Sequence, residues 1–283
     1  MVHEELADVF GREQIIRNVT RIGNGAHIFA PKEWLGERVI IVRSLKPSLK
    51  ERILKIIEPH LESILGVYLY GSYARGEQSE GSDIDVLVIA KNKFKIGKKD
   101  NFEFLVLKES FLEPAIKINP ILMYSIFKEA KAIINQGYLE KYKKININKK
   151  YFKPFINSTK GSIKSNEELL ELDKKTGKTA SNSIVYSCML RLRGIFIINC
   201  LVDGGQFSNK NFQRWLKENV NLDYSKIYYI YRKVRDEKSI KDEISLTTGA
   251  DLVNFLRDEL NKLAHKINSK KHKASSRLNF KGT

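Results

Sequence analysis

VYLYGSYARGEQSEGSDIDVLVI (residues 67–89) joins two short apolar runs through a polar stretch rich in glycine, serine and acidic residues. The runs VYLY (67–70) and VLVI (86–89) have the length and composition of buried strands. GSYARG follows the first run directly, and SDID leads into the second. The stretch therefore predicts two strands of one sheet, with a functional loop between them.

Two acidic residues stand at the head of the second predicted strand. Because side chains alternate between the faces of a strand, Asp83 and Asp85 are expected on one face and Ile84, Val86 and Val88 on the other. Two carboxylates placed in this way repel each other unless a cation lies between them. Magnesium suits this position, since it is usually bound by one or two carboxylates together with substrate phosphates and water. We therefore predict that Asp83 and Asp85 bind Mg²⁺.

A third carboxylate is expected from a neighbouring strand. Two metal ions about 3.5–4 Å apart can stabilise both the attacking and the leaving oxygen of a phosphoryl displacement. FEFLVL (102–107) is the next predicted strand, and Glu103 shares its face with the two leucines of that run. A charged side chain in so apolar a strand requires a partner or a metal. Glu103 is the predicted third ligand, with Glu109 and Glu113 as weaker candidates and a solvated edge-strand position as the alternative for Glu103.

The turn after the first strand has the features of a phosphate site. Gly71 and Ser72 follow a strand and open a predicted helix, where free backbone N–H groups attract phosphate. Glycine allows close approach, and the Ser72 hydroxyl can donate a hydrogen bond. Arg75 is expected either to contact the nucleotide phosphates or to steady the loop. A P-loop is rejected, because Glu77 and Gln78 stand where that motif requires lysine and then serine or threonine.

Length, charge and cysteine content set the broad class of the chain. Its 283 residues are enough for two domains, and its net charge is +17. The charge is zero over residues 1–43, +6 over 44–150 and +11 over 151–283, which favours nucleotide or RNA partners or a solvated lysine-rich surface. No apolar run reaches the roughly 18 to 20 residues of a membrane span and no signal peptide is evident, so a cytoplasmic protein without a membrane partner is expected. Cys188 and Cys200 are expected to be buried free thiols.

The pattern along the chain predicts an α/β (α+β) protein in three parts. Residues 1–44 form a small β module, with two strand-like pieces around a GNG turn and a helical turn at PKEWLG. Residues 45–150 form the catalytic domain, a mixed sheet with flanking helices that include residues 48–65 and 120–134. Residues 151–268 form a helical bundle around a central helix at 182–202, which helps to build the acceptor pocket, and residues 269–283 a basic disordered tail.

The run YGSYARGEQSEGSDIDVLV resembles the DNA polymerase β-like nucleotidyltransferases, and specifically their minimal branch. GS at 71 and 72, ARG at 74–76 and SDID at 82–85 fall in the order of that family's signature, and the resemblance covers residues 48–145. It implies two Mg²⁺ ions, with Mn²⁺ as an alternative, and transfer of a nucleoside monophosphate from an NTP such as ATP, with release of pyrophosphate. It also implies that Asp83, Asp85 and Glu103 are the catalytic metal ligands and that Gly71 and Ser72 hold the triphosphate. The family more often has aspartate at the third position.

Two further resemblances concern the flanking parts. IGNGAHIFAPKEWLG is similar to the AbrB-like swapped-hairpin modules, which pair as homodimers and often bind DNA. The zero net charge of this part favours dimerisation over DNA binding. The C-terminal bundle is similar in architecture to the helical domains that follow the catalytic domain in aminoglycoside nucleotidyltransferases and in HEPN-associated pairs.

These observations predict a Mg²⁺-dependent nucleotidyltransferase whose nucleotide-binding residues are Gly71, Ser72 and Arg75. An NTP is the expected substrate, and RNA or tRNA, a protein and a small molecule remain open as the acceptor. A second copy of the chain, bound through the N-terminal module, is the expected homodimer partner. The alternative is a non-catalytic DNA-binding regulator or a toxin-antitoxin component built on the same scaffold.

Overall fold

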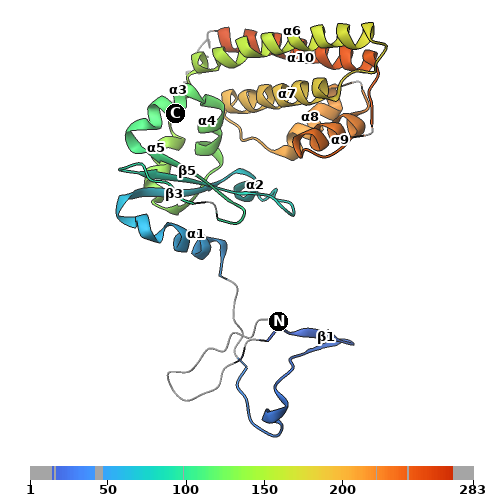
Figure 1. Ribbon diagram of the computed structural model, residues 1–283. Helices are drawn as coiled ribbons and strands as arrows, with labels where there is room; N and C mark the ends of the chain where they lie inside the picture. The colour runs from blue at the N-terminus through green and yellow to red at the C-terminus, as the bar shows by residue number, and fades with distance from the viewer. Residues whose placement is uncertain are drawn as a thin grey trace, which may run out of the picture. The chain divides into compact units, whose positions relative to one another are not determined.

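The computed structural model describes residue 15 and residues 17–41, 47–97, 99–220, 222–240 and 242–269 (Figure 1). It divides into two compact units, residues 1–48 and residues 49–283. Apart from Ser269, the predicted basic tail lies outside the described residues.

The N-terminal unit contains a short hairpin. Strands β1 (Thr20–Ile22) and β2 (Gly25–His27) pair antiparallel around the predicted turn, and a 3₁₀ helix covers Lys32–Trp34. Much of its apolar surface is exposed, at Val19, Ile22, Ile28, Phe29, Leu35, Val39, Ile40 and Ile41. The hairpin matches the predicted local structure, whereas the resemblance to AbrB-like modules and the pairing of two copies stay predictions.

The second unit is built on a mixed four-stranded sheet. Its strands are β3 (Ile64–Tyr70), β4 (Ile84–Ala90), β5 (Phe102–Lys108) and β6 (Lys131–Ile134), in the order β5-β4-β3-β6. β4 runs parallel to β5, while β3 is antiparallel to both β4 and β6. The predicted mixed sheet with flanking helices is therefore confirmed.

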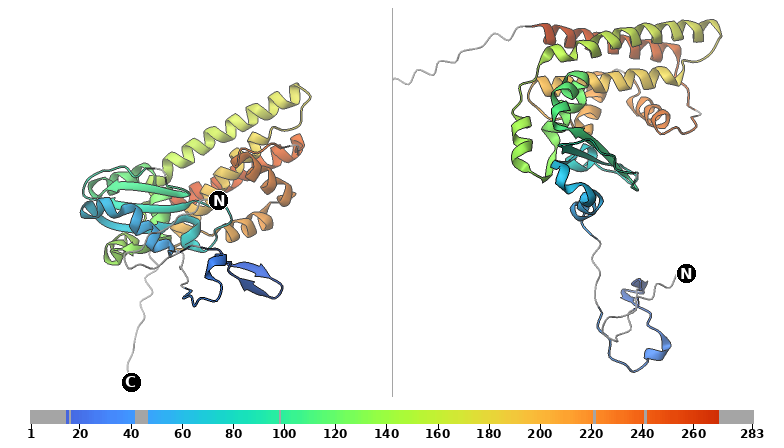
Figure 2. Two further views of the ribbon diagram at one scale, coloured as in Figure 1. Left: turned by 60° about the horizontal axis from the view of Figure 1, so that its bottom comes forward. Right: turned by 60° about the vertical axis from the view of Figure 1, so that its left-hand side comes forward.

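Helices cover both faces of this sheet, as the turned views of Figure 2 show. Helix α1 (Leu49–Ile57) packs on one face through Ile53 and Ile57, in a cluster with Val67, Ile84, Val86, Val88 and Phe102. The other face packs against α3 (Leu112–Ile118), α4 (Pro120–Glu129) and α5 (Gln136–Lys143) through residues that include Tyr68, Leu87 and Ile89. Alternation along β4 thus sends its odd and even positions to opposite faces, as predicted.

Two predicted helices are shorter than the sequence pattern indicates. Helix α1 ends at Ile57, a 3₁₀ helix covers Glu58–Ser63, and strand β3 begins at Ile64. Pro59 lacks the N–H that would continue the α-helical ladder. The helix predicted over 120–134 is wrong beyond Glu129, because residues Lys131–Ile134 form β6 and complete the sheet beside β3. Pairing with an open strand edge overrides the weak helical preference of this apolar segment.

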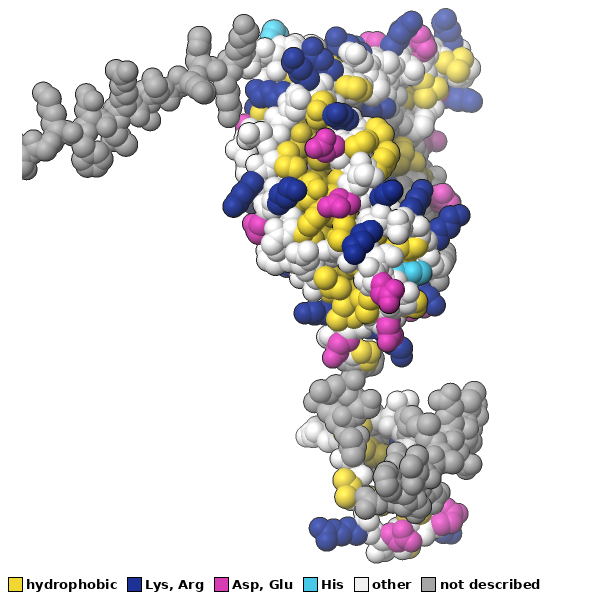
Figure 3. Space-filling model, turned by 90° about the vertical axis from the view of Figure 1, so that its left-hand side faces the viewer, with side chains coloured by type: hydrophobic (Ala, Val, Ile, Leu, Met, Phe, Trp, Pro, Cys, Tyr) yellow, Lys and Arg dark blue, Asp and Glu magenta, His cyan; other side chains and the backbone are white. Residues whose placement is uncertain are grey.

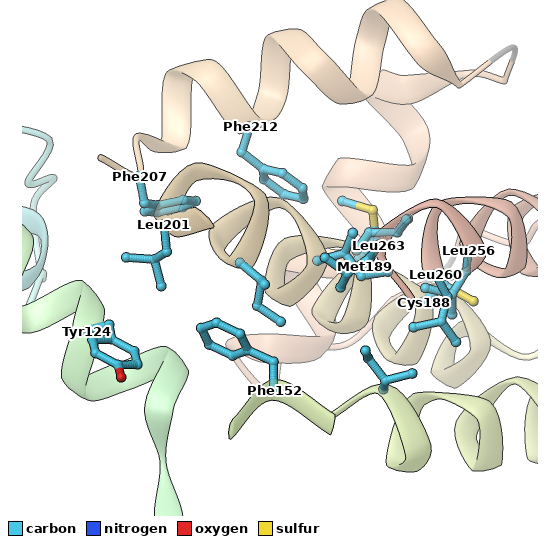
Figure 4. Packing of buried hydrophobic residues seen from close by; sticks show 14 of the residues in the cluster. Tyr124, Phe152, Cys188, Met189, Leu201, Phe207, Phe212, Leu256, Leu260 and Leu263 are labelled. Carbon is cyan, nitrogen blue, oxygen red and sulfur yellow. The ribbon is translucent and has the colours of Figure 1, made fainter. Parts of the chain in front are cut away.

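The C-terminal bundle contains five longer helices. They are α6 (Lys153–Lys175), α7 (Asn182–Val202), α8 (Asn209–Asn219), α9 (Tyr224–Arg235) and α10 (Leu246–Asn268). Among the described helices, α7 has the length and apolar composition of a membrane span, and half of that segment is buried within this unit. It matches the predicted central helix, and Figure 4 shows Met189 and Cys188 of α7 beside Leu260 and Leu263 of α10. Cys188 is buried and Cys200 partly buried, and both are free thiols.

One hydrophobic core continues from the sheet into the bundle. Tyr124 of α4 lies 6.1 Å from Phe152, measured between ring centroids, and both belong to the same cluster as the buried side chains of α7 (Figure 4). The domain boundary predicted near residue 150 therefore separates the sheet with its helices from the bundle, and the two share one hydrophobic core. The loops of the sheet and the loops of the bundle are consequently held in fixed relation within this unit.

Candidate active site

The carboxylates predicted from the sequence lie at one end of the neighbouring strands β4 and β5. In strand β4, Asp85 is paired with Tyr70 of β3 on one side and with Glu103 of β5 on the other. Asp83 directly precedes β4 and, like Glu103, is exposed, whereas Asp85 is half-buried. Register alone therefore makes Asp85 and Glu103 direct neighbours, with Asp83 two residues from Asp85.

The ionised form of Asp85 is disfavoured at this position. Burial and, after it, the negative charges of Glu103, Asp83 and Glu129 together raise the pKa of Asp85 from 3.8 to about 6, although the positive charge of Arg75 opposes them. The same surroundings act on the neighbouring phenol of β3. Burial, followed by the charges of Asp85, Glu103 and Glu129, raises the pKa of Tyr70 above its ordinary value. The negative charges of several carboxylates are thus concentrated around Asp85 and Tyr70.

The glycine-serine turn packs directly against this acidic group. Gly71 and Ser72 open helix α2 (Gly71–Arg75), which begins where β3 ends. Gly71 has a φ of +72°, and a Cβ at this position would lie 2.0 Å from Oδ2 of Asp85. Only glycine fits both the left-handed backbone and the contact. The Ser72 hydroxyl is partly exposed and makes no hydrogen bond to any described residue.

A carboxylate that sequence reasoning missed completes the turn. Glu129 is the last residue of α4. Its carboxylate accepts a hydrogen bond from the Gly71 N–H at 2.8 Å and forms an ion pair with Nη1 of Arg75 at 2.7 Å. Its side chain is almost fully buried, with 7% exposed. Glu129 is more than fifty residues along the sequence from the loop that it contacts. The local sequence indicates its role only by placing an acidic residue at the end of an apolar helix.

Arg75 is engaged by two carboxylates. Besides the ion pair with Glu129, its Nε donates to Oε2 of Glu77 at 2.9 Å, and its guanidinium lies over the ring of Phe207. Only 13% of its side chain is exposed. Of the two roles predicted for Arg75, this arrangement is that of a residue steadying the loop.

The same network joins the loop to the bundle. Glu77 accepts hydrogen bonds from Oγ of Ser208 at 2.7 Å and from the backbone N–H groups of Asn209 and Lys210, at the start of α8. Burial opposes its ionisation, but the hydrogen bonds from Ser208, Arg75 and the backbone outweigh burial and hold the pKa of Glu77 below its ordinary value. A carboxylate at a helix N-terminus is stabilised by the unpaired N–H groups.

The donor set suits a magnesium ion that is shared with a substrate. Within the described part of the chain, no three His, Cys, Asp or Glu side chains are arranged to hold an ion by themselves. Mg²⁺ is usually bound by one or two carboxylates and completed by phosphate oxygens and water. The Asp85 and Glu103 pair meets that demand, and their mutual repulsion is the feature that a cation would relieve. The predicted triad of Asp83, Asp85 and Glu103 stays a prediction. Of the weaker candidates, Glu109 accepts a hydrogen bond from Tyr138.

Comparison with known proteins identifies a family and a curated relative. Residues 50–160 match the family described as "Nucleotidyltransferase domain". A protein of Methanocaldococcus jannaschii named "Putative protein adenylyltransferase MJ1305" is 32% identical over 142 residues, which are 49% of this chain and 96% of the relative. The match therefore covers nearly the whole length of the relative and about half of this chain.

Three solved structures show more distant likeness. Spectinomycin adenyltransferase AAD(9) from Enterococcus faecialis is 17% identical, with a TM-score of 0.41 over 74% of this chain and 97% of that one. A nucleotidyltransferase-like protein from Exiguobacterium sibiricum is 12% identical, with a TM-score of 0.39 over 78% of each chain. A toxin-antitoxin structure with AMP-PNP is 19% identical, with a TM-score of 0.27 over 34% of this chain and 81% of that one.

Proposed function

From the premise that this chain belongs to the nucleotidyltransferase family and is an enzyme of that class, we propose that it transfers AMP from ATP to a protein hydroxyl group, with Mg²⁺ as cofactor. The name of the Methanocaldococcus relative supports ATP as the donor and a protein as the acceptor. This proposal chooses among the acceptors that the sequence left open. The non-catalytic regulator is set aside, because the family and the relative both indicate an enzyme.

The in-register pair of Asp85 and Glu103, packed against the turn at Gly71, is the observation that carries the proposal. The pKa of Asp85 is raised by burial and by its acidic neighbours, more than the charge of Arg75 offsets, which supports a site for a cation here. We propose that Asp85 and Glu103, with Asp83, hold Mg²⁺ together with the phosphates of ATP. When bound, the ion would neutralise phosphate charge and the charge that develops on the leaving pyrophosphate.

The chain's own groups position the triphosphate for in-line transfer. The acceptor oxygen forms a bond to the α-phosphorus, while the bond from that phosphorus to the oxygen bridging to the β-phosphate breaks, and pyrophosphate leaves. The absence of a side chain at Gly71 lets the phosphates approach the turn. The Ser72 hydroxyl, which has no hydrogen-bond partner among the described residues, donates to a phosphate oxygen. Glu129 accepts a hydrogen bond from the Gly71 N–H, so this N–H is used to hold the turn and is not free for phosphate, whereas the sequence predicted a free N–H there.

The test compares ATP labelled at the α-phosphate with ATP labelled at the γ-phosphate. The purified protein is incubated with Mg²⁺ and a protein extract, and label transfer and pyrophosphate release are measured. The α-label is expected to enter protein in a form that resists RNase and is removed by protease. The Asp83→Ala/Asp85→Ala variant should lose this transfer, whereas Glu80→Ala, which removes an exposed carboxylate of the same loop, should retain it.

Three results would count against the proposal. Transfer of the γ-label would indicate a kinase, and α-label that is sensitive to RNase would indicate an RNA acceptor. Equal pyrophosphate release by the wild type and the Asp83→Ala/Asp85→Ala variant would remove the two aspartates from the reaction.

A further inference from the structure

A second, basic site lies apart from the acidic one. A cavity of about 740 Å³ opens where the end of α5 and the segment after it meet the end of α7. Four lysines line it, Lys128, Lys143, Lys144 and Lys149, and among the described lining residues Asp203 is the one acid. Neither the predicted carboxylates nor Gly71 or Ser72 contributes to this cavity.

The charge of the single acid is already compensated. Nζ of Lys266 lies 2.7 Å from Oδ2 of Asp203 and also donates to Oδ1 of Asn199 at 3.0 Å. Lys266 is not itself among the lining residues. The lining residues therefore carry a net positive charge.

Two of the four lining lysines have no partner among the residues that the structure describes. Lys143 pairs with Glu140 at 3.2 Å, and Nζ of Lys149 donates to the carbonyl oxygen of Lys266 at 2.9 Å. In contrast, neither Lys128 nor Lys144 has an acceptor for its ammonium group among the residues that the structure describes. Lys128 is half-buried, so part of its stem is held against the wall while its charge is left unpaired.

These features fit a ligand with several phosphates. The volume lies within the range of ordinary ligand sites, and the lining offers ammonium groups, which bind phosphate as point charges. No aromatic side chain is among the described lining residues, so the cavity offers no platform on which a base could stack. Recognition would therefore be of a phosphate backbone and would not depend on base sequence.

The surrounding chain is basic, which fits a long polyanion such as a nucleic acid strand, with a charge at every phosphate. Residues 151–283 carry a net charge of +11, and the sequence that follows Ser269, itself a lining residue, contains five Lys and Arg and no Asp or Glu. Figure 3 shows Lys and Arg side chains spread over much of one face of the molecule. A concave site of this size admits a single strand more readily than a rigid duplex.

We propose that this lysine-lined cavity binds the phosphate backbone of a single-stranded nucleic acid. RNA and DNA share that chemistry, and both are arms of the test. The inference goes beyond nucleotidyl transfer and does not depend on it, because binding here requires neither ATP nor the carboxylates of β4 and β5. A protein without transferase activity would still bind the strand.

The test is fluorescence anisotropy with labelled RNA and DNA strands of the same sequence, each of about 12 nucleotides, without ATP. The variant Lys128→Gln/Lys144→Gln removes the two unpartnered lysines and leaves the contacts of Lys143 and Lys149 in place. The control Lys164→Gln/Lys175→Gln removes the same charge from exposed positions on α6. Circular dichroism melting establishes that both variants are folded.

Salt dependence gives the expected size of the effect. Each phosphate contact with a single strand contributes about 0.7 to the slope of log affinity against log salt, so losing two should flatten the slope by about 1.4. That change corresponds to about 25-fold weaker binding at about 0.1 M salt, whereas the control should lose less than about 3-fold. Binding of RNA, of DNA or of both with this pattern supports the proposal and identifies the source of the phosphates.

The proposal is overturned if the cavity variant and the control bind alike, or if neither strand binds the wild type. It is also overturned if polyglutamate of similar length competes as well as the unlabelled strand, since the cavity would then select an acidic peptide.

Discussion

Replacing Asp85 with asparagine is expected to stabilise the fold and to abolish activity. The Asp85 carboxylate is half-buried between Tyr70 and Glu103, and its oxygens accept no hydrogen bond from any described residue. Burial and the charges of its acidic neighbours therefore act against its ionised form, and the charge of Arg75 offsets them only in part. Asparagine has nearly the same shape and carries no charge.

The pKa of Asp85 gives the sign and the size of the effect. With a pKa of about 6 in the folded state against 3.8 ordinarily, the native protein binds more protons than the unfolded chain between these two values. The free energy of unfolding therefore falls as the pH rises through this window, and the loss is complete above about pH 6. The full difference would correspond to about 3 kcal/mol. Because this carboxylate is only partly buried, solvent screening reduces the expected gain to about 1 kcal/mol at neutral pH.

Urea unfolding at two pH values measures this directly. Asp85→Asn should exceed the wild type by about 1 kcal/mol at neutral pH and equal it near pH 4, where the wild-type carboxyl is protonated. Asp83→Asn is the control, because that side chain is exposed and its removal should change stability little. A variant that is less stable at neutral pH, or whose gain does not depend on pH, would refute the reasoning. If the site binds Mg²⁺, the ion should raise the stability of the wild type more than that of Asp85→Asn.

Two further substitutions test the turn and its link to the bundle. Gly71→Ala and Gly76→Ala both place alanine at a φ near +70°, which costs roughly 1 kcal/mol in each case, but only Gly71→Ala also forces a Cβ to within 2.0 Å of Oδ2 of Asp85. Gly71→Ala should therefore melt lower and lose activity, and equal melting temperatures would exclude the contact as the cause. Glu77→Ala removes the carboxylate that accepts the N–H groups at the start of α8 and should lower the free energy of unfolding by about 1–2 kcal/mol. Glu80→Ala, at an exposed position of the same loop, should cost less than about 0.5 kcal/mol, and similar losses for the two variants in urea unfolding would contradict this role.

Local pattern was sufficient where a side chain's position depends on its own strand. Alternation predicted that Asp85 would lie opposite Ile84 and Val86, and the structure buries both of these against α1. The same rule predicted that Glu103 would share a face with the leucines of β5, on the side away from Phe102. The turn at Gly71 was predictable because glycine there directly follows a strand.

Long-range pairing was not predictable from the same patterns. Strand β6 reads as the continuation of a helix, since its four residues give no signal until the open edge of β3 is present. Glu129 reaches the turn only because α4 packs across the sheet, and nothing in the spacing of its neighbours indicates that contact. Arg75 could have met phosphate or protein, and only the positions of two distant carboxylates distinguish these partners.

The apolar face of the sheet is what keeps the acidic residues together. A slip of one residue in β4 would exchange Asp85 for Val86 and move every side chain to the opposite face. Such a slip would relieve the repulsion with Glu103, but it would remove Ile84, Val86 and Val88 from their packing against α1 and place the Asp85 carboxylate in that apolar cluster. Burial of three β-branched side chains outweighs the roughly 1 kcal/mol expected for the charged carboxylate, so the register holds. The fold thus retains at Asp85 an unfavourable charge that binding of a cation would relieve, which is why removing this charge should strengthen the fold and disable the site together.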